Sequence, residues 1–217
     1  MKIKQNFTRA LLICLACCFS SVLSAQDTTE LQTSVDGLVA TALADPSLDL
    51  SDSVAVQAAI DSVMTGAYGL VPTLTAAETQ IIAAAVMSAF TVQIQAIPSI
   101  SADAAGSAIA SVASAVVSAA VEASDGDTAM IAAAASGVVQ GAIKATSDDS
   151  AASTTEVITA AASGATSGAI EATSSDGDTS AVDAIAAAAN GATTAAVDAT
   201  SDGDAADTTA AITAAAS

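Results

Sequence analysis

Residues 131–149 read IAAAASGVVQGAIKATSDD, and this alanine-rich stretch returns in modified form further along the chain. The copies are ITAAASGATSGAIEATSSDGD from Ile158 and IAAAANGATTAAVDATSDGD from Ile185, and Ile212 opens another. The isoleucines at 131, 158, 185 and 212 therefore follow one another at a constant step. A fixed period of roughly 20 to 50 residues is the signature of stacked supersecondary units. The stretch predicts an array of repeats, each of about 27 residues.

Each repeat has room for one helix and one short loop. Alanine is the best helix former, and the Ser-Asp-Gly-Asp segments supply turns and helix stops. Capping boxes at Ser153–Glu156 and Ser180–Asp183 fall at matching positions of two copies. Polyalanine can also form stacked β-sheets, but alanine and glycine are depleted in strands. We therefore predict helices, with an earlier copy over 102–123 that is followed by a shortened connection.

The chain before the array is more varied and predicts three further helices, bounded by capping boxes and prolines. They cover about residues 27–44, 53–67 and 75–97. The predicted fold is all-α, with an N-terminal helical region over residues 26–100. An alanine-rich helical repeat array follows over residues 101–217, in a solenoid- or bundle-like arrangement.

The segment over residues 1–25 has the pattern of a secretory signal peptide. Three basic residues precede an apolar run over residues 10–23, and small residues before Gln26 allow cleavage after Ala25. A buried N-terminal helix is the alternative. Cys17 also lies in a context that resembles a lipoprotein box, although Cys14 stands where leucine is expected. We expect export to the cell surface or medium, or to the periplasm of a Gram-negative bacterium.

Cleavage would make the remaining chain strongly acidic. It removes three of the four basic residues and none of the 23 acidic ones, which leaves Lys144 and a net charge of −22. Such a chain repels nucleic acid and attracts divalent cations and basic surfaces. All three cysteines lie in the signal, so disulfides are not expected.

Catalysis is not expected from this sequence. The chain has no histidine, and no phosphate-binding loop or dinucleotide fingerprint occurs. Tyr68 and Phe90 are the only aromatic residues after the signal, whereas carbohydrate-cleaving sites use paired carboxylates together with aromatic platforms. We predict no enzyme and no cofactor other than, as an alternative, Ca²⁺.

The repeats place small residues four apart on their helices, which permits close approach of a neighbouring backbone. We predict that this face mediates contacts between copies, through the glycines Gly137, Gly141, Gly164, Gly168 and Gly191. The same spacing pairs helices in membranes, and residues 79–102 and 104–121 carry no charge. Because serine and glutamine dilute these runs and no basic residue flanks them, a membrane span is not predicted.

The acidic loops are the predicted metal site. Two carboxylates around a glycine resemble the first part of a calcium loop, and the candidates are Asp125, Asp127, Asp176, Asp178, Asp202 and Asp204. A complete calcium site needs about 6–8 oxygens, more than one loop supplies. The alternative is a solvated turn whose aspartates cap the next helix.

Two classes of function follow. The first is a secreted, non-catalytic structural or interaction protein that self-associates into a surface layer, filament or matrix component. The second is a soluble binder of divalent cations or of ice. For ice, the alanine-rich helices resemble helical antifreeze proteins in composition. That family has threonine at a regular interval, and the same interval separates Thr155 from Thr166 here.

Overall fold

The computed structural model describes residues 29–45, 48–49, 52–71, 74–97, 100–146, 151–173 and 180–200. The described residues form seven helices and no strand, which confirms the all-α prediction. A helix over residues 29–43 is followed by α2 (Ser53–Tyr68), α3 (Ala76–Gln95), α4 (Ala102–Ala123), α5 (Thr128–Ala145), α6 (Ala151–Thr173) and α7 (Ser180–Thr200). The predicted signal peptide and the copy opened by Ile212 lie outside the described residues.

Several helix boundaries fall where the sequence predicts them. The helix α4 covers the predicted segment, and α2 extends the prediction by one residue, to Tyr68. At the start of α3, Thr75 and Glu78 form the predicted capping box. The backbone N–H of Thr75 donates to Glu78 Oε2 over 2.9 Å, and the N–H of Glu78 donates to Thr75 Oγ1 over 3.3 Å.

The two capping boxes predicted inside the array are wrong. The helix α6 already begins at Ala151, so the Ser153–Glu156 segment lies within it. Ser180 is the first residue of α7 and therefore follows the capping position. In α6, Ala151 and Ala152 precede the predicted start, and the high helix propensity of alanine favours extending the helix through them.

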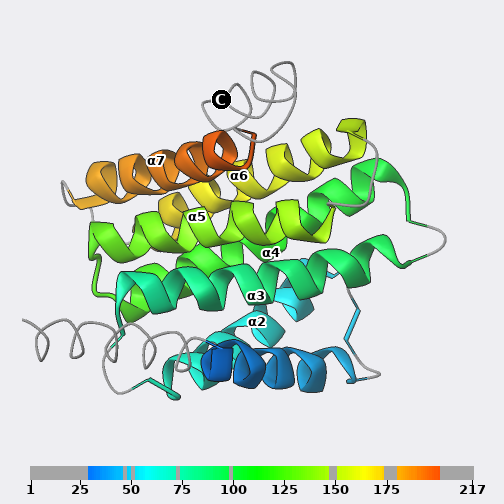
Figure 1. Ribbon diagram of the computed structural model, residues 1–217, viewed down its shortest axis with the longest axis horizontal. Coiled ribbons are helices and arrows are strands. Elements are labelled where there is room, and N and C mark those ends of the chain that lie inside the picture. Colours follow the sequence, from blue (N-terminus) through cyan, green and yellow to red (C-terminus); the bar gives the residue numbers. More distant parts are fainter. Residues whose placement is uncertain are drawn as a thin grey trace, which may run out of the picture.

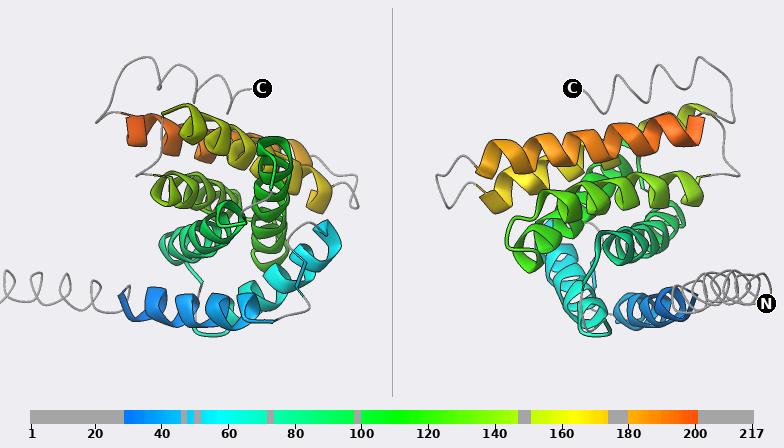
Figure 2. Two further views of the ribbon diagram at one scale, coloured as in Figure 1. Left: turned by 90° about the vertical axis from the view of Figure 1, so that its right-hand side faces the viewer. Right: turned by 60° about the vertical axis from the view of Figure 1, so that its left-hand side comes forward.

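The helices stack in two alternating series. The most extensive contacts join helices two apart in the chain: α3 with α5, α5 with α7, and α4 with α6. Figure 1 shows α3, α5 and α7 one above another, with α4 and α6 behind them. Figure 2 shows the helix over residues 29–43 and α2 at the opposite end of the stack from α7. Each repeat helix is thus packed mainly on the helix that lies two repeats earlier.

The core changes in character along the stack. Large side chains fill it near the N-terminal helices, where Phe90, Ile60 and Ile82 are completely buried. Around α6 and α7 the buried residues are mostly alanines, such as Ala161 and Ala188. Burying an alanine methyl group stabilises a fold by only about 1 kcal/mol or less. Close packing of helices therefore matters more in the array than the area that each side chain buries.

Three of the helices, α3, α4 and α5, are long and apolar enough to cross a membrane, judged by length and composition alone. About half of the most apolar window of each is buried inside the structure, between 44% and 50% of it. These helices occupy the middle of the stack, where their apolar faces meet other helices of the chain. Apolar helix faces of this kind occur both in packed interiors and in membrane spans.

Candidate functional site

The predicted contact glycines lie at close helix crossings within one chain. On α5, a methyl group at Gly137 would lie 2.9 Å from Ala83 Cβ of α3 and would overlap the carbonyl oxygen of Gln80. At Gly141, one turn further on, the added methyl group would lie 2.9 Å from Met87 Cβ. Because any side chain would overlap α3, only glycine permits this approach of the two backbones.

The same contact recurs in the next repeats. On α6, Gly164 and Gly168 lie against the backbone of Ala110 and Ser114 in α4. The two helices run parallel, because the contacting residue numbers rise together. On α7, Gly191 lies against the backbone of Ala132 in α5. All five predicted glycines are thus buried between helices that are two apart in the chain.

The structure gives these glycines a role that the sequence did not predict. The glycine faces were predicted as surfaces between copies, and the structure uses them between repeats of one chain. The role in contacts between copies stays a prediction. A polar contact accompanies the first crossing, since Gln80 Nε2 donates to Gln140 Oε1 over 3.0 Å and to Ser136 Oγ over 3.3 Å.

The one described acidic loop is a tight turn that caps a helix. Asp125 and Gly126 have positive φ angles of 51° and 80°, and Asp127 is the N-cap of α5. The carboxylate of Asp127 accepts the backbone N–H of Ala129 over 2.8 Å. No group of three or more His, Cys, Asp or Glu side chains suited to a metal ion occurs among the described residues. The candidates Asp176, Asp178, Asp202 and Asp204 lie outside the described residues.

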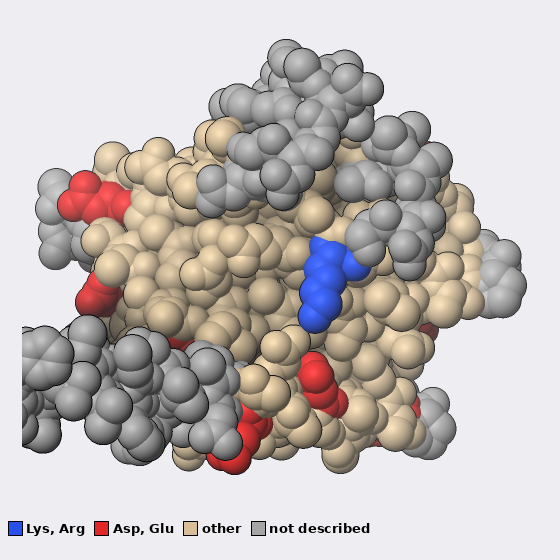
Figure 3. Space-filling model, in the orientation of Figure 1, with Lys and Arg blue, Asp and Glu red and all other residues tan. Residues whose placement is uncertain are grey.

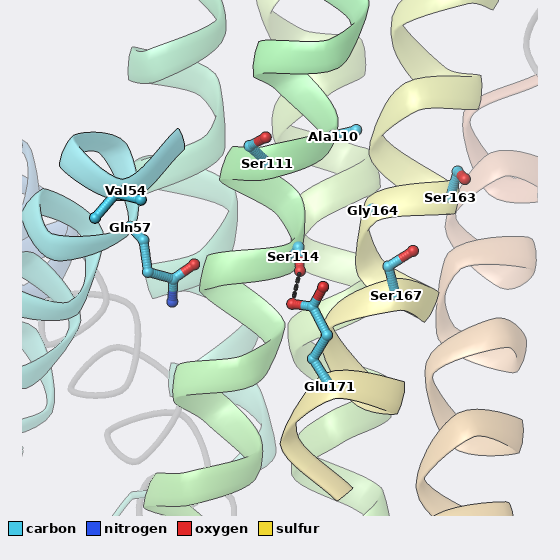
Figure 4. A pocket seen from close by; sticks show the side chains of 9 residues that line it. All are labelled: Val54, Gln57, Ala110, Ser111, Ser114, Ser163, Gly164, Ser167 and Glu171. Atoms are coloured by element: carbon cyan, nitrogen blue, oxygen red, sulfur yellow. Dashed lines mark hydrogen bonds between the residues drawn. The ribbon is translucent and has the colours of Figure 1, made fainter. Parts of the chain in front are cut away.

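A groove between α4 and α6, lined by serine, threonine and acidic residues among small apolar ones, could not be predicted from the sequence alone. It consists of two adjoining pockets, of about 490 and 840 Å³, which share Ala110 and Ser163 in their walls. The smaller pocket also reaches Val54 and Gln57 of α2 (Figure 4). In the sequence, polar residues recur at every fourth position of α6 and therefore share one face of the helix. The residues on this face line the groove, and they are Thr155, Thr159, Ser163, Ser167 and Glu171.

Hydrogen bonds order several of the groove's side chains. The hydroxyl of Ser114 donates to Glu171 Oε2 over 3.0 Å and so joins α4 to α6 (Figure 4). The hydroxyls of Ser107, Ser111 and Thr159 donate to carbonyl oxygens four residues earlier in their own helices. Carboxylates stand at both ends of the groove, Asp103 and Glu156 at one and Glu171 at the other.

Large apolar side chains are exposed on the helices at the C-terminal end of the stack. Ile170 of α6 is 44% exposed, and on α7 Val182 is 69% and Val197 is 37% exposed. Ile170 and Val197 occupy the repeat position of Ile143 in α5, which is partly buried against the core. Among the described helices, the same position is therefore partly buried in α5 and exposed in α6 and α7.

On the face drawn in Figure 3, the described acidic side chains are spread out rather than gathered at one point. Figure 3 shows separate carboxylates on one face of the molecule, with broad neutral surface between them. No protein family, curated protein or solved structure matches this chain.

Proposed function

We propose that this chain is a secreted, non-catalytic structural or interaction protein that associates with copies of itself. In this proposal the repeats form a short solenoid, in which each helix packs on the helix two repeats earlier. The described acidic loop, over residues 125–127, joins α4 to α5, and the high negative charge keeps the alanine-rich surface soluble. The partner is a second copy of the chain, and neither nucleic acid nor a resident cofactor takes part.

The observation that carries this proposal is the exposed repeat position on α6 and α7. Ile170 and Val197 are exposed at the repeat position that Ile143 occupies in α5, where the side chain is partly buried. A stacked array normally ends in a polar cap, because an open apolar end is a surface for further stacking. A second copy that packs on these helices would bury Ile170 and Val197, at the repeat position that is partly buried as Ile143 in α5.

Sedimentation of the chain after residue 25, over a wide range of concentrations, tests the association. We expect dimers or larger species, and we expect Ile170→Ser combined with Val197→Ser to shift the chain towards monomer. Val92→Ser is the matched control, since Val92 is 46% exposed on α3, away from the end of the stack. A wild-type chain that stays monomeric at every concentration contradicts the proposal, and a calcium-dependent shift in size would instead favour bridging by the acidic loops.

A membrane-embedded protein is the second candidate, because α3, α4 and α5 are long and apolar enough to span a bilayer. In that case the glycine crossings would pair the helices inside the membrane. Alkaline carbonate extraction of cells that express the full chain separates the two candidates. Release into the soluble fraction supports the secreted protein, and retention with the membrane pellet supports the embedded one.

A further inference from the structure

We propose that the groove between α4 and α6 binds a linear polyamine, an extended chain that carries several ammonium groups. The inference is independent of self-association, because none of the lining residues belongs to the exposed positions Ile170, Val182 or Val197. The binding site is formed by the two adjoining pockets, which together follow α4 and α6 along most of their length.

The hydrogen-bonding groups of the groove favour a ligand that donates hydrogen bonds. Four of its hydroxyls already donate their hydrogen, those of Ser107, Ser111, Ser114 and Thr159. A hydroxyl whose hydrogen is used still offers oxygen lone pairs, and a carboxylate only accepts. The amide nitrogen of Gln57 donates to Asp61 Oδ1 over 3.2 Å. A ligand that donates hydrogen bonds therefore finds more acceptors than donors along the groove.

The charge of the groove favours a cation with separated charges. Its lining residues include the carboxylates of Asp103, Glu156 and Glu171, and no lysine or arginine. Glu156 and Glu171 are separated by about four turns of α6, which corresponds to about 22 Å along the helix axis. A single metal ion cannot span this distance. An extended tetraamine such as spermine is somewhat shorter than it, but flexible glutamate side chains can reach inward to its terminal ammonium groups.

The middle of the groove suits the methylene segments between the ammonium groups. Ala110, Ala160 and Gly164 form its walls between the two acidic ends, and Val54 lies beside the smaller pocket. Gly164 brings α6 against the backbone of α4, which keeps the floor free of bulky side chains. Sugars are less suited, because the lining residues include no aromatic ring on which a sugar could stack.

Isothermal titration of spermine into the chain after residue 25, at pH 7 and about 0.1 M salt, tests this inference. We expect saturable binding of one spermine per chain. Ser163→Lys should weaken it at least tenfold, because the lysine brings a positive charge to the middle of the groove. Thr194→Lys is the control, since Thr194 is exposed on α7 outside the groove and the change in net charge is identical. We expect its affinity to stay within twofold of wild type.

Equal weakening by both lysine variants would overturn the inference, because it would show general association of a cation with an acidic protein. Binding that never saturates would also overturn it. A second pair of variants covers the case in which Ser163→Lys fails to fold. Glu156→Gln combined with Glu171→Gln should weaken binding about tenfold, whereas Glu122→Gln, on α4 outside the groove, should leave it unchanged.

Discussion

Gly164 lies against the backbone of Ala110, two repeat lengths earlier in the chain, and a methyl group at Gly164 would sit 2.8 Å from Ala110 Cα. The same relationship links Gly168 to Ser114. Large side chains stabilise the N-terminal part of the core, but in the alanine-rich part this close approach takes their place. Dispersion contacts between two backbones are individually small and become substantial only when the helices are in direct contact.

The capping box of α3 gives a first prediction. Replacing Thr75 by alanine removes the side-chain oxygen that accepts the N–H of Glu78, so the free energy of unfolding should fall by about 1 kcal/mol. Urea unfolding followed by circular dichroism measures the loss. Thr65→Ala is the control, because Thr65 is exposed within α2, and it should leave stability unchanged or slightly raised. Equal effects of the two substitutions would contradict the capping role.

Substitution of Thr91 should raise the free energy of unfolding rather than lower it. It is fully buried in α3, and its hydroxyl has no hydrogen-bond partner in the described structure. Thr91→Val removes an unsatisfied polar atom and should raise the free energy of unfolding by about 1 kcal/mol. Thr79, in the same helix and equally buried, donates to the carbonyl of Thr75 over 2.9 Å. Thr79→Val should therefore destabilise the chain, and a gain in stability there would contradict this account.

The single tyrosine predicts how stability depends on alkaline pH. Burial raises the pKa of the Tyr68 hydroxyl above its ordinary value, and this hydroxyl has no partner among the described residues. In the unfolded chain the group loses its proton near pH 10. Stability is thus fully present below about pH 10 and falls as the pH rises further, by about 1.4 kcal/mol per pH unit at most.

Absorbance at 295 nm reports the ionisation of Tyr68 directly. We expect tyrosinate to form only as the chain unfolds, and Tyr68→Phe to remove the part of the alkaline loss of stability that this group causes. A reversible titration near pH 10 in the folded chain would show that Tyr68 is accessible to solvent, contrary to the structure.

Helix positions could be predicted well from the sequence, because they depend on local signals. The Thr75–Glu78 box and the Asp127 cap satisfy backbone N–H groups near them in the chain, and such pairs are visible as short motifs. The start of α6 was missed because alanine extends a helix beyond a polar capping motif.

The pairing of helices two apart could not be predicted, because alanine and glycine faces fit one another in several registers. Gly191 occupies the same repeat position as Gly164, and Gly137 the same repeat position as Ala110. Because Gly164 packs on Ala110, a regular packing would place Gly191 on Gly137. It meets Ala132 instead, more than one helical turn away. The repeat is regular in sequence, but its packing register is not.

The groove follows from this pairing of helices. Ser111 and Ser163 line one pocket only when α4 and α6 are neighbours. The groove residues on α6 could be identified from the sequence, because polar residues that recur at every fourth position share one face of a helix. The facing helix could not be found, because its identity depends on the packing of the array.

Glycine contacts between helices two apart hold the alanine-rich repeats together, and a pair of glycine substitutions tests this most directly. Gly164→Ala should lower the free energy of unfolding in urea by about 1–3 kcal/mol, because the new methyl group overlaps α4. Gly37→Ala, in the helix over residues 29–43, places a methyl group in open space and should raise the free energy of unfolding by about 0.5–1 kcal/mol. A Gly164→Ala chain that is as stable as wild type, or more stable, would contradict the account.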